Sequence, residues 1–148
     1  MFNTILAAYD GSSGADAALE KAAGLAKLTG AELIILTVYQ HHSMLEASLS
    51  MMRGESTTGE SNLDDIMRTI SKEAAEKAKV AAKDHGVENV TAFIKRGPTS
   101  RTIVAFAEDK HCDLVVVGSR GAGSSEGYML GSVSHKVTSL SDVPVLVV

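Results

Sequence analysis

A glycine-rich stretch in the last third of the chain contains the residues best suited to binding a ligand. It spans residues 118–134 and reads Gly-Ser-Arg-Gly-Ala-Gly-Ser-Ser-Glu-Gly-Tyr-Met-Leu-Gly-Ser-Val-Ser. It follows the continuous apolar run Leu-Val-Val-Val and leads into a segment of helical period. Glycines expose backbone N–H groups, and N–H groups at the start of a helix attract anions. The stretch therefore predicts a loop that binds an anion such as phosphate.

Two common phosphate-binding motifs do not fit this stretch. A P-loop requires G-x4-G-K-[ST], but Ser124 stands where the lysine must reach the β and γ phosphates. A dinucleotide fingerprint requires G-x-G-x-x-G after the first strand, but Glu126 stands at the position of its third glycine. The spacing that remains is G-x2-G-x9-G-S, which begins at Gly118.

The charged and titratable residues leave the chemistry of this region partly open. Arg120 can pair with a phosphate or remain a solvated loop charge, and Glu126 places a negative charge where phosphates would lie. His41, His42 and His135 have no spacing typical of a Ser-His-Asp triad or of a metal site. We therefore assign neither a catalytic residue nor a metal ligand among the side chains.

The elements that must position these residues alternate between strands and helices. Short apolar runs predict strands, and segments with a period near 3.6 residues predict helices. The expected strands cover residues 4–9, 31–38, 90–94, 113–118 and 143–148, and the expected helices cover 13–28, 63–85, 99–110 and 132–140. Ser12 or Ser13 is the expected N-cap of the first helix. The amphipathic pattern of the second helix consists of Ile66, Ile70, Ala74, Ala78 and Ala81.

This alternation predicts a doubly wound α/β fold. Right-handed crossovers make neighbouring strands parallel and bring helices to both faces of the sheet. We expect a Rossmann-like five-stranded parallel sheet in one domain over residues 1–148, with a long loop over residues 39–62. Ligands bind such sheets beyond the carboxyl ends of the strands, so the loops after the first, second and fourth strands are of most interest.

Composition argues against several classes of function. The 148 residues carry a formal net charge of -4, and the Lys and Arg residues are scattered, which does not favour nucleic-acid binding. No stretch reaches the roughly 18 apolar residues of a membrane span, and the N-terminal apolar run is too short for a secretory signal. The single Cys112 cannot form an intramolecular disulfide, which fits a reducing compartment. We therefore expect a cytoplasmic protein that binds neither nucleic acid nor membrane.

The chain as a whole resembles the universal stress protein family, specifically its ATP-binding branch. The glycine spacing matches that branch without a gap. The resemblance extends from Ile5 to Val148 and includes Tyr-Asp-Gly-Ser at 9–12, Arg-Gly-Pro at 96–98, Asp-Leu-Val-Val-Val-Gly-Ser-Arg-Gly at 113–121, Gly-Ser-Val-Ser at 131–134 and Val-Pro-Val-Leu-Val-Val at 143–148. Only residues 39–62 lack a motif, and that segment is variable in such proteins.

The resemblance implies a site for ATP. Its triphosphate cradle would be Gly118, Gly121, Gly131, Ser132, Val133 and Ser134, unless these glycines merely form turns. Asp10 would accept hydrogen bonds from the ribose, with helix capping as the alternative, and the main chain of Val38 would meet the adenine edge while its side chain can belong to the core. A Mg²⁺ or Mn²⁺ ion bridging the phosphates would offset the charge of Glu126.

The implied function is that of a nucleotide-dependent stress-response or regulatory module rather than a fast enzyme. One alternative is a dimeric scaffold that has lost nucleotide binding. Another is an ATP-pyrophosphatase-like adenylating enzyme, whose S-G-G-x-D-S loop is approached but not matched by Ser-Ser-Gly-Ala-Asp-Ala at 12–17.

The terminal apolar strand predicts self-association. In the family that the chain resembles, this strand pairs antiparallel with its copy across a two-fold axis, and such a contact closes at two subunits. Pro144 cannot donate a hydrogen bond to the ladder, so we expect a homodimer joined through Val145–Val148. The alternative is a monomer in which this strand lies between neighbours in its own sheet.

Overall fold

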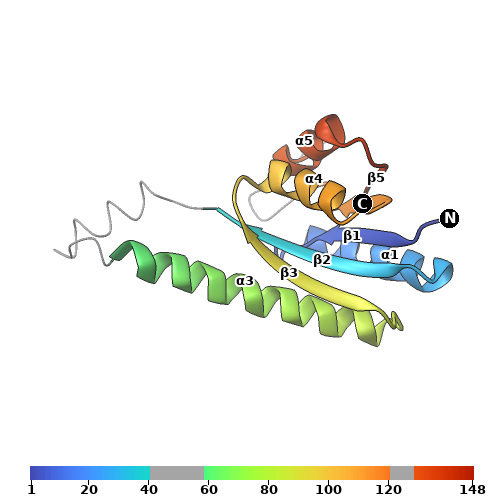
Figure 1. The fold of residues 1–148 in the computed structure, drawn as a ribbon, viewed down its shortest axis with the longest axis horizontal. Coiled ribbons are helices and arrows are strands. Elements are labelled where there is room, and N and C mark those ends of the chain that lie inside the picture. Colours follow the sequence, from blue (N-terminus) through green and yellow to red (C-terminus); the bar gives the residue numbers. More distant parts are fainter. Residues whose placement is uncertain (41–58, 121–128) are drawn as a thin grey trace.

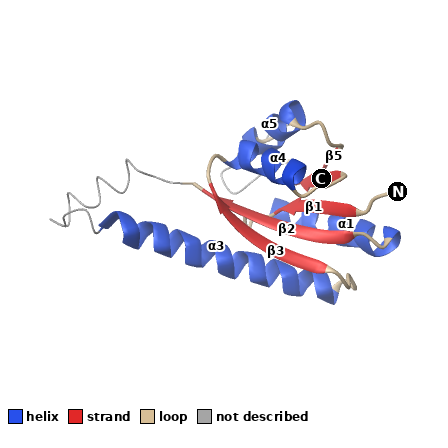
Figure 2. Cartoon of the chain, viewed as in Figure 1, coloured by secondary structure: helices blue, strands red, loops and turns tan. Residues whose placement is uncertain are grey.

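Strands and helices alternate along the chain (Figures 1 and 2), which the computed structural model describes at residues 1–40, 59–120 and 129–148. In chain order the elements are β1 (Thr4–Ala8), α1 (Ser13–Thr29), β2 (Glu32–Tyr39), α3 (Gly59–Asp84), β3 (Val90–Arg96), α4 (Thr99–Asp109), β4 (Leu114–Val117), α5 (Ser132–Leu140) and β5 (Val145–Val147). The strands form one parallel sheet in the order β3-β2-β1-β4-β5. The predicted doubly wound, five-stranded fold is confirmed.

Helices cover both faces of this sheet (Figure 1). Side chains alternate between the faces along each strand. On β1, Ile5 therefore packs into the cluster beneath α1 and α3, whereas Leu6 packs into the cluster beneath α4 and α5. Burial on both faces explains why the strands read as nearly continuous apolar runs in the sequence.

The first helix, α1, has a defined cap at each end. Ser12 is the N-cap, and its hydroxyl accepts a hydrogen bond of 3.1 Å from the Ala15 N–H. The helix ends at Gly30, whose φ of 73° is the left-handed conformation that favours glycine. Of the two serines predicted as N-cap, the structure selects Ser12.

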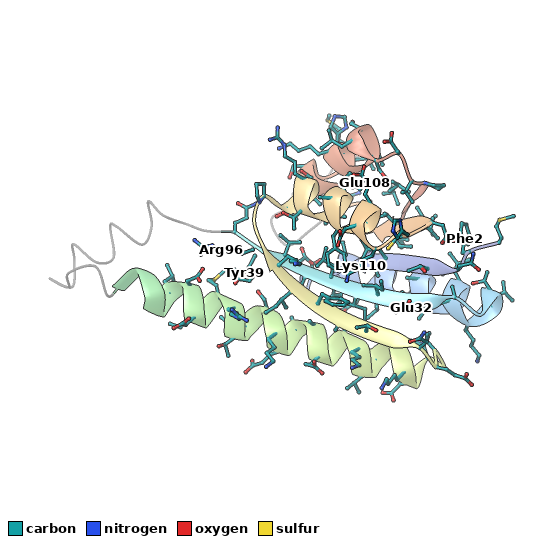
Figure 3. The ribbon with its side chains drawn as sticks, in the orientation of Figure 1. Phe2, Glu32, Tyr39, Arg96, Glu108 and Lys110 are labelled. Atoms are coloured by element: carbon teal, nitrogen blue, oxygen red, sulfur yellow. The ribbon has the colours of Figure 1, made fainter. Side chains whose placement is uncertain are left out.

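The ends of β2 and β3 lie beyond their predicted limits. The two strands pair residue for residue up to Tyr39 and Arg96, which lie side by side in Figure 3. Helix α3 begins at Gly59, earlier than predicted. The predicted loop over residues 39–62 is therefore wrong at both of its ends, and its central part, residues 41–58, lies outside the described residues.

The apolar pattern predicted for α3 is only partly buried. Ile66 and Ile70 are 54% and 56% exposed, while Ala78 is buried as expected. The buried stripe of α3 runs through Ser71, Ala75 and Ala78, so Ile66 and Ile70 lie beside it rather than on it. Figure 1 also shows that the first turns of α3 extend past the sheet. Among the described helices, none is long and apolar enough to cross a membrane.

Candidate functional site

A cavity of about 370 Å³ opens at the carboxyl ends of the central strands. Its position is the one expected for a ligand site in a doubly wound sheet, since the strand order reverses beside β1. The cavity is lined by eight of the nine residues predicted from the sequence, namely Asp10, Val38, Gly118, Arg120, Gly131, Ser132, Val133 and Ser134. The ninth, Gly121, lies outside the described residues, as does Glu126.

One end of the cavity is an apolar slot. It is built by residues at or near the carboxyl ends of β1, β2 and β4 and by one side chain each from α1 and α4, namely Ala8, Ala15, Leu36, Val38, Ile103 and Val117. Sequence reasoning identified only Val38 among these, because apolar residues at strand ends look the same as core residues. For Ala8, Leu36 and Val117 the only signal is their position at or near the carboxyl end of a strand, and the two residues on helices give no signal.

The other end of the cavity contains the start of α5. Gly131 is its N-cap and provides no side chain to cap the helix. The N–H groups of Ser132, Val133 and Ser134 have no partner within the helix, because the first helical hydrogen bond joins the His135 N–H to the Gly131 carbonyl at 3.0 Å. These three N–H groups and the positive end of the helix dipole can bind an anion.

The carbonyl of Ser119 joins the residues that follow β4 to the start of α5. That oxygen accepts one hydrogen bond of 2.6 Å from the Gly131 N–H and another of 2.9 Å from the Ser134 hydroxyl. Ser134 is only 2% exposed, and its hydroxyl also donates to the Gly131 carbonyl at 3.0 Å. The hydroxyl predicted to contact a ligand therefore ties the start of α5 to Ser119, which leaves the Ser134 N–H as the contribution of this residue to the anion site.

Asp10 lines the cavity from the short segment that joins β1 to α1. Its Oδ1 atom accepts hydrogen bonds from the Ser12 N–H at 2.9 Å and from the Ser12 hydroxyl at 2.5 Å. Asp10 does not cap α1 itself, as one interpretation of the sequence proposed, but orients the Ser12 side chain that does. The side chain of Asp10 is exposed and so can be reached by a ligand.

Positive charge enters the cavity through Arg120. Its side chain is exposed, and among the described residues it forms no ion pair. Arg96, by contrast, pairs with Asp64 on α3 at 3.5 Å. The described part of the chain has no cluster of three or more His, Cys, Asp or Glu side chains that could hold a metal ion.

Tyr9 also lines the cavity and was not predicted from the sequence. It is buried, and its hydroxyl donates a hydrogen bond of 2.6 Å to Oδ1 of Asp16 on α1. Burial, followed by the hydrogen bond to Asp16, raises the pKa of Tyr9 from 10.0 to about 12. The neutral phenol thus ties the end of β1 to the first turns of α1.

The raised pKa of Tyr9 predicts a loss of stability at high pH. The unfolded chain releases this proton near pH 10 and the folded chain near pH 12, so the folded state binds more protons between these values. The contribution of Tyr9 to the free energy of unfolding is complete below pH 10. It falls by roughly 2 kcal/mol as the pH rises toward 12. Urea unfolding across this range should show the loss in the wild type and a smaller one in Tyr9→Phe. Parallel losses in the two proteins would contradict the prediction.

Comparison with known proteins places the chain in a family. The family model described as the universal stress protein family matches residues 1–148. Universal stress protein YxiE of Bacillus subtilis is 40% identical over 151 residues, which cover 100% of this chain and 99% of that protein. The solved structure of hypothetical protein MJ0577 is 30% identical with a TM-score of 0.82, covering 100% of this chain and 96% of that one.

A second solved structure, of a universal stress protein in complex with cAMP, is 25% identical with a TM-score of 0.71 and covers 99% of this chain and 96% of that one. The likeness in these comparisons covers 99% or more of the chain. The chain belongs to the universal stress protein family.

Proposed function

We propose that this protein is an ATP-binding universal stress protein that acts as a stress-response or regulatory module in the cytoplasm. The observation that carries the proposal is the presence of an apolar slot and an anion-binding helix start in one cavity of about 370 Å³. That volume lies within the range of about 300–1,000 Å³ that is typical of small-molecule sites. A nucleotide has the same two parts, a flat base and a phosphate chain.

The proposed orientation of ATP follows from the chemistry of the two ends. The base would lie in the apolar slot against Val38 and Ile103, and the phosphates would lie at the free N–H groups of α5 beside Arg120. Asp10, between these ends, would accept hydrogen bonds from the ribose hydroxyls. The cAMP bound in a 25% identical universal stress protein supports adenine as the base.

A divalent cation would accompany the phosphates in this proposal. Mg²⁺ is usually bound by phosphate oxygens and water with only one or two carboxylates from the protein. The described cavity residues fit that arrangement, since Asp10 is their only carboxylate. The ion, Mg²⁺ or Mn²⁺, would neutralise part of the phosphate charge and also part of the repulsion from Glu126.

We propose binding rather than rapid hydrolysis of ATP. Among the described residues that line the cavity, the titratable side chains are those of Tyr9, Asp10 and Arg120. The Tyr9 hydroxyl donates to Asp16 and the Asp10 carboxylate accepts from Ser12, so neither is positioned as a general base for a water molecule. Phosphoryl transfer to water needs such a positioned nucleophile as well as stabilising cations.

Calorimetric titration of the purified protein with ATP and Mg²⁺ should give saturable heat, with weaker binding of GTP. Turnover of ATP in the same sample should stay far below the value of about 10 per second that is typical of enzymes. An absence of heat, together with an unchanged melting temperature in ATP, would favour the scaffold that has lost nucleotide binding. A turnover near the typical value would instead favour an enzyme.

We also propose that the protein is a homodimer joined through Val145–Val148. β5 pairs with β4 and ends the strand order, so the alternative in which it lies between neighbours in its own sheet is wrong. These four residues are only partly buried in the single chain. An open apolar edge of this kind favours pairing with another strand.

A further inference from the structure

The first turn of α1 touches the backbone that follows β4. A Cβ atom built on Gly14 would lie 2.3 Å from the carbonyl oxygen of Arg120. A Cβ atom built on Gly118 would lie 2.8 Å from the carbonyl oxygen of Gly14. Both contacts are with backbone atoms, so no side-chain rotation can relieve them. The two segments can lie at this separation only because both positions are glycine.

Another glycine in the same helix has no such contact. A Cβ atom built on Gly24 would meet no heavy atom within 4 Å. Glycine weakens a helix relative to alanine, because it loses more backbone freedom on folding. Gly24 therefore has no packing requirement in the described structure, whereas Gly14 permits a contact that alanine would block.

Both polar parts of the site are attached to the turn that contains Gly14. On one side, Asp10 binds Ser12, whose hydroxyl accepts from the Ala15 N–H in the first turn of α1. On the other side, the backbone of Arg120 lies against Gly14, and the preceding carbonyl, of Ser119, binds the N–H of Gly131 at 2.6 Å. The position of this turn therefore affects Arg120 and the start of α5.

We infer that Gly14 is a positioning residue for the phosphate end of the proposed ATP site. Its missing side chain lets segment 118–120 lie against α1, which fixes Arg120 and the N–H groups of α5 at a set distance from the apolar slot. This inference rests on the proposed function. Five of the six side chains of the slot lie on strands or on α4, and only Ala15 comes from α1, so we expect the slot to depend less on the contact at Gly14 than the phosphate end does.

Gly14→Ala separates the two ends of the site. The added methyl group must displace segment 118–120, so affinity for ATP should fall by about tenfold or more, which is about 1.4 kcal/mol. Affinity for adenosine, which has no phosphate, should change by less than about twofold. The matched control is Gly24→Ala, which should bind both ligands like the wild type and melt about 2–4 °C higher. Calorimetry with ATP and with adenosine measures the affinity of each variant, and of the wild type, for each ligand.

Hydrogen exchange of the wild type tests the same inference without a substitution. ATP should slow the exchange of backbone N–H groups in the first turn of α1 and in segment 118–120, and adenosine should not. Equal losses of ATP and adenosine affinity in Gly14→Ala, or unchanged affinities, would overturn the inference. If Gly14→Ala does not fold, exchange rates that ATP leaves unchanged in the wild type would overturn it. A wild-type protein that binds no ATP refutes the proposed function itself, and the inference with it.

Discussion

Replacement of Ala8 by Phe is expected to lower the affinity for ATP by roughly 100-fold or more, which is about 2.7 kcal/mol. Ala8 is the last residue of β1, and its half-buried side chain lines the apolar slot beside Leu36 and Val117. A phenyl ring at this position occupies the space in which the base would lie. Because the ring enters an existing cavity, the packing strain of an overfilled core, typically about 1–3 kcal/mol, should largely be avoided.

The matched control for this prediction is Ala17→Phe. Ala17 is exposed on α1, so this variant adds the same ring at the surface and leaves the slot open. Calorimetry should show wild-type ATP binding for Ala17→Phe and none within the measurable range for Ala8→Phe. A folded Ala8→Phe protein that binds ATP with wild-type affinity would place the base outside the slot.

The sequence predicted the polar half of the candidate site but not most of its apolar half. Glycine and serine at fixed spacing after a buried strand are uncommon in a core, so residues such as Gly118 and Ser132 could be selected from their pattern. Leu36, Val117 and Ile103 line the same cavity, but all three also belong to the apolar cluster between the sheet and helices α4 and α5. In the sequence they therefore look like core residues. Only the three-dimensional positions of the strand ends separate cavity walls from core.

The order of elements could be predicted with more success than their limits. Periodicity is a local property of the chain, so it predicted the alternation of strands and helices. The end of β2 depends instead on its pairing with β3, which continues to Tyr39. The exposure of Ile66 depends on which face of α3 packs against the sheet. The role of the Ser134 hydroxyl depends on the position of the distant Ser119 carbonyl.

The outer edge of β5 can be assigned from its hydrogen bonds to β4. The Pro144 carbonyl accepts from the Val115 N–H at 2.9 Å, and the Val148 N–H donates to the Val117 carbonyl at 2.9 Å. Backbone groups alternate in direction along a strand, so Val145 and Val147 direct their N–H and C=O groups away from β4. The missing N–H of Pro144 is therefore on the β4 side, and the outer edge has a donor at each valine.

Val147→Pro is expected to convert the proposed dimer to a monomer. The proline removes the outward N–H, while the hydrogen bonds to β4 come from residues 144, 146 and 148 and remain possible. In a two-fold antiparallel pairing this donor occurs twice. Loss of two hydrogen bonds at about 1 kcal/mol each weakens the dimer by about 2 kcal/mol, or roughly 30-fold, before any steric clash is included. Light scattering over a dilution series measures the change.

Val147→Thr is the matched control, because it has nearly the same shape as valine and retains the backbone N–H. It should remain dimeric at concentrations where Val147→Pro is monomeric. Deletion of Leu146–Val148 should also give a monomer, but it removes contacts with β4 as well and is therefore less specific. A full-length wild-type protein that is monomeric at micromolar concentration would show that the edge of β5 is protected in another way. A Val147→Pro protein that remains dimeric would place the two-fold contact on a different surface.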